Sequence, residues 1–272
     1  MRDAFVLATL RKLQTDAWLA PSDSVLAICA AASEQRVFQA AGLQTATISN
    51  LDDRLASPDY APYSWSYQDA QHLSFDNASF DHVFVSDGLH HCDSPHRGLV
   101  EMFRVARKSV IVFESRDSLL MRLANRTGLV PEFEVEAVIG SGLAHGGVNN
   151  TEVPNFVYRW TEREFEKTIA SFYPEGPCGF RYFYSMNLPT ARVAMSGNRL
   201  KALAVRLAVP VAKLLEWLAP SQGNSFCMVA RKPQNGALWP WLEMQGGKVA
   251  FRRSYADGYK ATATGKTGGY FK

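Results

Sequence analysis

Three histidines of this chain have the chemistry of general bases. His90 and His91 are adjacent, and His145 precedes the pair Gly146–Gly147 in a polar stretch. A neutral imidazole accepts a proton near physiological pH and can therefore activate a hydroxyl nucleophile. Each histidine also has a structural interpretation: His90 and His91 by packing and fixing a loop, and His145 as an ordinary residue of a surface loop. We take His91 and His145 as the candidate catalytic residues.

The residues after the histidine pair include further potential metal ligands, namely Cys92, Asp93 and His96. Adjacent residues cannot easily turn toward one ion, however, and the spacing matches no zinc pattern. We therefore expect no metal site. The four cysteines lie far apart in the sequence without a Cys-x-x-Cys pair, which favours a reducing compartment. We expect a cytoplasmic protein.

A long stretch over residues 130–160 is rich in Gly, Asn and Pro. A connector of this length in a compact domain usually has a binding role. Its amide, phenol and guanidinium groups suit a small polar or carbohydrate-like molecule, and they could equally form the seam between this insertion and the rest of the domain. The candidate substrate-binding residues are Asn149, Asn155, Tyr158 and Arg159 in this stretch, together with Glu114 at the end of an expected strand.

An alternation of buried strands and amphipathic helices would position these side chains. Continuous apolar runs such as Val25–Ile28 are typical of strands covered on both faces. We expect strands over 24–31, 45–49, 63–67, 80–86, 110–114, 180–186 and 226–230, and helices over 2–20, 33–41, 95–106, 119–127, 162–172 and 200–218. Thr161 and Glu164 form a capping box for one of these helices. The rhythm predicts a doubly wound α/β domain with a mostly parallel sheet.

Ligands of such a sheet bind beyond the carboxyl ends of its strands. One stretch that crosses these ends resembles the central half of the class I S-adenosylmethionine-dependent methyltransferases, of the type 11-like branch. The resemblance spans about residues 24–115. It is carried by Asp69, Leu73, Phe75, Asp76, Phe80, Asp81, Val83, Leu89, His90, His91, Pro95, Leu99, Glu101, Arg104, Val105 and Val110 to Val112.

The resemblance implies a seven-stranded Rossmann-like sheet with helices on both faces and S-adenosylmethionine as the cofactor. It implies that Asp69 accepts a hydrogen bond from the adenine amino group, with the backbone of Ala70 beside the ring. The residues expected to bind the cofactor are Cys29, Ala30, Ala31, Asn50, Asp69, Ala70 and Ser86.

Two departures from the family pattern concern the cofactor itself. Family members carry a glycine-rich loop after the first strand, where this chain has Cys29 and three alanines. The second strand ends at Ser49–Asn50 instead of an acid that would bind the ribose, and Asp52 and Asp53 follow slightly too late. Three functions are compatible with these residues: a methyltransferase that O-methylates a small polar acceptor, an inactive binding or regulatory protein of the same fold, or an enzyme with another ligand.

Residues 1–232 are expected to form one domain, with a core over 22–117, the insertion over 130–160 and a C-terminal part over 161–232. Residues 233–272 are expected to form a basic Gly- and Thr-rich tail.

A net charge of +3 is too small to predict a nucleic-acid partner. We expect no transmembrane segment. The helix over 200–218 carries basic residues around an apolar stripe and could lie on an acidic membrane surface or pack into the core. The sequence leaves the oligomeric state open.

Overall fold

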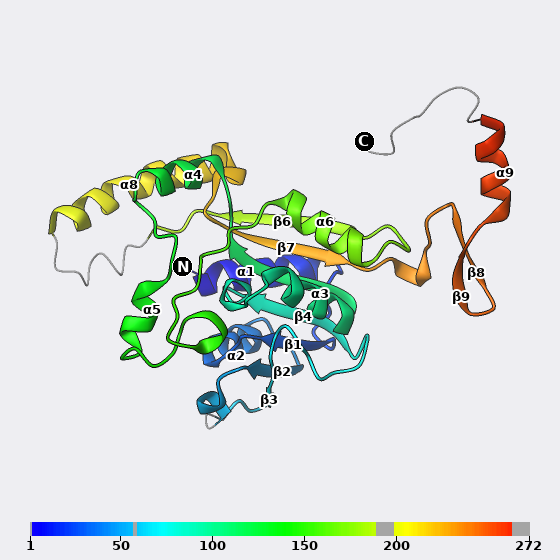
Figure 1. The fold of residues 1–272 in the computed structure, drawn as a ribbon. Helices are drawn as coiled ribbons and strands as arrows, with labels where there is room; N and C mark the ends of the chain where they lie inside the picture. The colour runs from blue at the N-terminus through cyan, green and yellow to red at the C-terminus, as the bar shows by residue number, and fades with distance from the viewer. Residues whose placement is uncertain (1, 57–58, 189–198, 263–272) are drawn as a thin grey trace.

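Seven strands form one sheet in the order β3-β2-β1-β4-β5-β7-β6 (Figure 1). The structure is a computed structural model that describes residues 2–56, 59–188 and 199–262. Strands β1 to β5 pair in parallel, whereas β7 runs antiparallel to both of its neighbours. The strands are β1 (Ser24–Ile28), β2 (Thr45–Asn50), β3 (Ser64–Tyr67), β4 (Phe80–Ser86), β5 (Ala106–Ser115), β6 (Gly179–Ser185) and β7 (Ser225–Arg231). The predicted doubly wound, mostly parallel sheet is confirmed.

Helices cover both faces of the sheet because its strands are apolar on both sides. Successive residues of β1 belong to different cores, since Leu26 packs with Phe103 on one face and Ala27 packs with Phe38 on the other. This is the alternation that a pleated strand imposes on its side chains. The helices of the first core are α1 (Arg2–Thr15) and α2 (Ala32–Ala40), and those of the second are α3 (Pro95–Val105) and α6 (Glu162–Phe172).

The first helix is shorter than expected, because α1 ends at Thr15 and not near residue 20. Ala17 adopts φ +56°, and the backbone amides of Trp18 and Leu19 turn back to the carbonyl oxygen of Leu13. A residue in the left-handed conformation ends a helix in the manner of a C-cap. The helix therefore stops before Pro21 is reached.

The insertion contains more regular structure than the sequence suggested. It follows α4 (Leu119–Arg126) and includes α5 (Val135–Gly140) and the short η3 (Val148–Asn150). Its two ends lie together, since Phe133 and Phe156 form a β-bridge and their rings meet edge to face at 5.5 Å. The capping box of Thr161 and Glu164 at the start of α6 is present as expected.

The C-terminal part completes the sheet and then continues beyond it. Between the last two strands of the sheet come α8 (Arg199–Leu218) and η4 (Pro220–Gln222). The expected tail differs from the structure, because its described part forms a hairpin of β8 (Leu242–Gln245) and β9 (Lys248–Phe251) followed by α9 (Arg253–Thr262). Residues 263–272 of that tail lie outside the described residues. No helix in the described ranges combines the length and the apolar character needed to cross a bilayer.

Candidate functional site

The carboxyl ends of the parallel strands border a cavity of about 230 Å³, which we call the strand-end cavity. Four residues that the sequence singled out for cofactor binding line it together, namely Cys29, Asn50, Asp69 and Ala70. The remaining lining residues are Leu51, Asp52, Leu55, Asp87, Gly88, His91, Cys92, Gly146, Gly147, Asn149 and Asn150. Ala30, Ala31 and Ser86 were expected here but do not line this cavity.

The alanine loop after β1 is closed by its own contacts. Cys29 takes φ +50°, a left-handed conformation that glycine adopts at no steric cost. The amide of Ala31 donates to the carboxylate of Glu34 at 2.9 Å, so it is already satisfied inside the protein. The loop also approaches the turn after β4 closely, because a Cβ on Gly88 would lie 2.5 Å from the Cβ of Cys29. The loop after β1 has no glycine, and the close approach of the two turns depends instead on Gly88 in the turn after β4.

Arg2, at the start of α1, is a candidate that sequence reasoning missed. Its guanidinium lies 2.9 Å from the carboxylate of Asp87 and 3.0 Å from that of Glu34, and it donates to the carbonyl oxygen of Ser86 at 2.7 Å. It therefore links the turns after β1 and β4. Burial raises the pKa of Asp87 to about 6, and the charge of Glu114 adds to this effect. Only the docking of α1 on the sheet brings residue 2 to this turn, so no spacing pattern could have revealed it.

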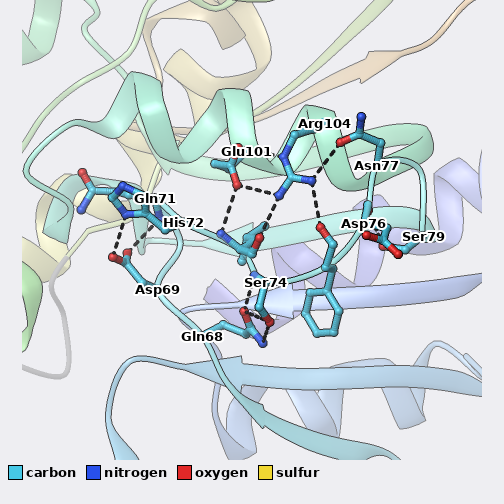
Figure 2. Close-up of polar contacts among 12 residues, drawn as sticks. Gln68, Asp69, Gln71, His72, Ser74, Asp76, Asn77, Ser79, Glu101 and Arg104 are labelled. Carbon is cyan, nitrogen blue, oxygen red and sulfur yellow. Dashed lines mark hydrogen bonds and ion pairs between the residues drawn. The ribbon is translucent and has the colours of Figure 1, made fainter.

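The loop over residues 68–79 is fixed by Arg104 of α3 (Figure 2). The guanidinium donates to the carbonyl oxygens of Leu73 and Phe75, each at 2.8 Å, and pairs with Glu101 at 2.8 Å. Glu101 in turn accepts from the backbone amide of Leu73 at 3.1 Å. Because these contacts hold backbone atoms, they fix the start of the loop at the wall of the strand-end cavity.

Asp69 lines the cavity and also has local partners. One carboxylate oxygen accepts from the amide of Gln71 at 2.9 Å, and the other lies 3.2 Å from Nδ1 of His72 (Figure 2). These are the contacts of an ordinary turn aspartate, which was the competing interpretation of this residue. Each carboxylate oxygen has a second lone pair, however, so the group can still accept a hydrogen bond from a ligand.

An acidic side chain, that of Asp52, reaches the strand-end cavity from the turn after β2. The side chain of Asn50 donates to the carbonyl oxygen of Ala30 at 3.2 Å and accepts from the amide of Asp52 at 3.0 Å. This turn brings Asp52 back to the cavity wall, although its position in the sequence seemed too late. A hydrogen bond from Arg54 lowers the pKa of the Asp52 carboxyl below its ordinary value. Asp52 therefore places an ionised carboxylate in the cavity wall near the end of β2, where the sequence indicated only the amide of Asn50.

The insertion closes one side of the strand-end cavity. Asn149 accepts a hydrogen bond from the side chain of Gln71 at 3.2 Å and donates one to Asp93 at 2.5 Å. Gly147 lies against the returning chain, because a Cβ there would meet the carbonyl oxygen of Val153 at 1.8 Å. Asn149 was expected to bind substrate, and the structure places it at the strand-end cavity instead.

A second cavity of about 270 Å³ adjoins the first, and we call it the insertion cavity. Cys92 lines both cavities. The other lining residues are His90, Asp93, Pro95, Val148, Pro154, Asn155, Phe156 and Tyr158. Two of the expected substrate-binding residues, Asn155 and Tyr158, therefore lie in one wall.

Asn155 is the clearest sign that the insertion cavity binds a ligand. The residue is only 2% exposed, and neither amide atom makes a hydrogen bond of normal geometry in the described part of the chain, although the amide lies near enough to Glu134 to help lower the pKa of that carboxyl. A buried amide without a partner is costly, and such groups normally pair with a ligand or a water molecule. Tyr158 beside it remains a protonated phenol, because burial raises its pKa to about 12 and its hydroxyl donates to Glu164 at 3.0 Å.

The two adjacent histidines differ in charge. Glu114, which is fully buried, accepts from two backbone amides of the turn after β4 and lies 2.7 Å from Nδ1 of His90. Burial disfavours charge on His90, but Glu114 and Glu134 outweigh it and hold the pKa of His90 well above its ordinary value. Burial, and then the charge of His90, lower the pKa of His91. A neutral imidazole thus lines the strand-end cavity at His91.

Glu134 joins the histidine pair from the insertion. Its carboxylate lies 3.4 Å from Nε2 of His91 and 3.7 Å from Nε2 of His90, and the potential ligand atoms of all three residues lie within 4.8 Å of one another. Contrary to the expectation from the sequence, the adjacent histidines converge, because both rings turn toward one carboxylate. A metal would have to replace the proton that two carboxylates hold on His90. We interpret the cluster as an ion pair that attaches the insertion, with the pKa of Glu134 lowered to about 2 by its contact with His90.

Three candidates lie elsewhere than we expected. Glu114 lines neither cavity, and its carboxylate oxygens contact the backbone of the turn after β4 and the ring of His90, which it positions. Arg159 donates to the carbonyl oxygen of Pro131 at 2.8 Å and braces the insertion from outside both cavities. His145 also lines neither cavity, and its amide is bound by Ser141.

Comparisons with known proteins agree with this fold. The sequence profile of the methyltransferase domain matches residues 27–113, which run from β1 to β5. No curated protein matches the sequence significantly.

Solved structures of similar fold cover most of the chain at low sequence identity. The YcgJ protein from Bacillus subtilis is 12% identical and aligns over 84% of this chain and 99% of its own, with a TM-score of 0.50. A SAM-dependent methyltransferase from Archaeoglobus fulgidus is 11% identical over 85% of this chain and 94% of its own, also at 0.50. A chain of the Haloferax volcanii complex between the Trm112 methyltransferase activator and a putative methyltransferase is 13% identical over 86% of this chain and 98% of its own, at 0.52.

The profile match falls on the strands that carry the strand-end cavity, and the strand order extends the likeness to the whole sheet. Residues 27–113 are therefore similar to the methyltransferase domain, and the sheet as a whole has the fold of these solved structures.

Proposed function

We propose that the protein is an S-adenosylmethionine-dependent methyltransferase that O-methylates a small polar or carbohydrate-like acceptor. The observation that supports this best is the pair of adjoining cavities. The strand-end cavity is lined by four of the seven residues expected to bind the cofactor, and the insertion cavity beside it carries a buried amide at Asn155 without a normal hydrogen bond. Methyl transfer requires two ligands side by side, which is what two cavities with a shared Cys92 wall provide.

The lining of the strand-end cavity fits the chemistry of the cofactor. Asp69 offers a carboxylate oxygen to the adenine amino group, with Ala70 beside it, and Asp52 offers an ionised acid to the ribose hydroxyls. Asp87 offers a carboxylate to the amino group of the methionine part. Arg2, at the start of α1, would attract the carboxylate of that part. When bound, S-adenosylmethionine supplies a methyl group activated by its sulfonium.

The chain's own contribution would be alignment of the acceptor and removal of one proton. Asn155 presents both a donor and an acceptor, and Tyr158 adds a hydroxyl, so the insertion cavity suits an acceptor with several hydroxyl groups. His91 is neutral and lines the adjoining cavity, so we assign it the role of general base. His145 has no such place in either cavity, so we do not retain it as a base.

A second function is favoured by the alanine loop. The amide of Ala31 and the carbonyl oxygen of Ser86 are already engaged by Glu34 and Arg2, so neither can serve a ligand without rearrangement. A binding or regulatory protein that no longer takes S-adenosylmethionine would retain such a closed loop. Cofactor affinity separates the two functions directly.

Calorimetric titration of the purified chain with S-adenosylmethionine and S-adenosylhomocysteine tests the proposal. We expect both to bind, and Asp69→Ala to weaken binding roughly tenfold through loss of one hydrogen bond to a charged group. Asp76→Ala is the matched control, because Asp76 is an exposed residue of the same loop that does not line the cavity. Absence of binding for both ligands at millimolar concentration would favour the regulatory function and exclude the transferase.

Turnover tests the assignment of His91. With an accepted hydroxyl substrate, His91→Asn is expected to lower kcat about 100-fold, as loss of a general base does, while cofactor affinity changes far less. His145→Asn serves as the control, because His145 is the other candidate base and lines neither cavity. Full activity of His91→Asn would remove the residue from the mechanism and leave the cofactor site unaffected.

A further inference from the structure

One helix of the molecule carries its apolar stripe on the outside. In α8, large apolar residues recur at helical spacing along a single face, at Leu203, Leu207, Val211, Leu214 and Leu218. All five are exposed, whereas Ala212 on the opposite side of the helix is buried. A helix that packs on its own domain shows the reverse pattern. The stripe therefore faces outward from the domain.

The stripe ends beside an exposed indole. Trp217 is 78% exposed, one of the most exposed large apolar side chains among the described residues. An exposed tryptophan at the end of an apolar helical face is typical of segments that rest at the boundary between water and lipid, because the ring is apolar and its N–H is polar.

α4 adds a second apolar surface close to the first. Its Leu119 and Leu123 are 70% and 59% exposed, and no residue of this helix is buried. Both helices contact η4, and the amide of Leu120 donates to the side chain of Gln222 in that turn. Figure 1 shows the two helices at the same edge of the molecule, at the upper left. We call the exposed faces of these helices the α4/α8 surface.

The two helices carry a net positive charge. Together they carry six basic residues and one acidic residue, whereas the whole chain has 29 basic and 26 acidic residues. Arg122 and Arg126 lie with Leu119 and Leu123 around a hollow of about 480 Å³ on α4. Arg206 and Lys213 on α8 are exposed. Long basic side chains at the edge of an apolar face attract anionic lipid headgroups while their stems remain on the apolar surface.

We propose that the α4/α8 surface docks on an anionic lipid membrane as a peripheral contact. A second copy of the chain fits less well, because a two-fold contact would bring this basic surface against itself. Neither helix needs to cross the bilayer for this contact, since the apolar stripe would enter only the outer part of the lipid layer. This membrane contact does not depend on methyl transfer. It accounts for the many large apolar side chains that are exposed on one part of the molecule.

Sedimentation with phosphatidylcholine vesicles, with and without phosphatidylglycerol, tests the proposal on the full chain. We expect binding to the anionic vesicles only, and weaker binding at high salt. The double charge reversal Arg206→Glu and Lys213→Glu is expected to lower the partition coefficient roughly 30-fold or more, since each basic residue contributes about fivefold near an anionic surface. Lys167→Glu and Lys248→Glu are the matched control, because both residues are exposed on other elements.

The apolar contribution is tested separately with Leu207→Asn and Leu214→Asn, against Met244→Asn and Phe251→Asn on the C-terminal hairpin. We expect only the first pair to weaken vesicle binding, by about tenfold or more. The tryptophan fluorescence of the wild type should shift to shorter wavelength on anionic vesicles, and Trp217→Phe should lose that shift.

Two results would overturn the proposal. Equal binding of wild type and both α8 double variants would show that other surfaces hold the lipid. Absence of vesicle binding, together with a dimer in light scattering that the leucine variants dissolve, would show that a second copy covers the stripe. Circular dichroism of each variant establishes that it is folded before these comparisons are made.

Discussion

Asp87 and Arg2 illustrate how single residues set the electrostatics of the strand-end cavity. They form an ion pair at 2.9 Å between the turn after β4 and the start of α1. Because burial raises the pKa of Asp87 to about 6, this carboxyl changes charge close to physiological pH. Most aspartates are fully ionised there. The charge that we expect to meet the amino group of the cofactor is therefore adjustable by pH.

We expect the affinity for S-adenosylmethionine to fall as the pH is lowered through about 6. Above this pKa Asp87 is ionised and attracts the positive amino group, and below it the carboxyl is neutral and the attraction is lost. Asp87→Asn should bind roughly tenfold more weakly at pH 8, through loss of one charge-assisted hydrogen bond, and should show a flatter pH profile. Titration calorimetry between pH 5 and 8 measures both. An unchanged profile in the variant would exclude Asp87 as the titrating group.

At the scale of elements, the site depends on loops that are fixed from outside. The loop over residues 68–79 is attached to α3 through Arg104 and Glu101, and the insertion is attached through Glu134 and Asn149. Among the residues that make these attachments, Asn149 and His91 also line the strand-end cavity, whereas Arg104, Glu101 and Glu134 do not. The strand ends provide the side chains, and the helices and the insertion hold them in place.

Replacing the loop anchor should affect both stability and binding. Arg104→Met is expected to lower the free energy of unfolding by about 2 kcal/mol, because charge-assisted hydrogen bonds to two carbonyl oxygens and a carboxylate are lost. The released loop should also weaken binding of S-adenosylmethionine. Arg97→Met is the control, because Arg97 is an exposed arginine of the same helix α3. Urea unfolding and calorimetry check the two effects, and wild-type affinity in Arg104→Met would show that the loop needs no anchor.

The sequence was informative wherever local pattern decides structure. Apolar runs predicted the buried strands, and the pair Thr161 and Glu164 predicted the start of α6, because both signals depend on neighbours in the chain. It failed where the partners are remote. Arg2 and Asp87 are far apart in the sequence although their side chains form an ion pair. The return of Asp52 to the cavity wall depends on the turn that Asn50 makes.

The residues of the insertion were the hardest to place. Its composition indicated binding, yet Asn149 and Asn155 lie in different cavities, and Arg159 lies in neither. The direction of a side chain in a segment with little periodic structure is set by tertiary contacts that leave no repeat in the sequence. The same limit applies to Glu134, which no spacing rule connects with His91.

At the scale of the whole molecule, the two cores on either side of the sheet have different consequences for the site. α1 carries Arg2 into the strand-end region and is held by buried residues such as Leu10 and Leu13. α6 lies on the other face and is held by Phe165 and Ile169. Loss of packing under α1 is therefore expected to reach the strand-end cavity through Arg2, whereas α6 carries no residue that lines this cavity.

Leu10→Ala and Ile169→Ala test this difference. Each removes a fully buried branched side chain and should lower the free energy of unfolding by about 3 kcal/mol. Only Leu10→Ala should also weaken binding of S-adenosylmethionine, because it loosens the helix that places Arg2. Chemical unfolding measures the first effect and calorimetry the second. Equal affinities in the two variants would show that the position of α1 does not matter to the ligand.

The contacts of Asn149 have a kinetic consequence. Its hydrogen bonds to Gln71 and Asp93 join the insertion to the turns on the far side of the strand-end cavity. A ligand that enters on this side must first separate these side chains, so its association should be slower than diffusion allows. Once the bonds have formed again, the same contacts delay its departure. In the proposed methyltransferase, exchange of the spent nucleoside for a fresh one would then set the pace of turnover.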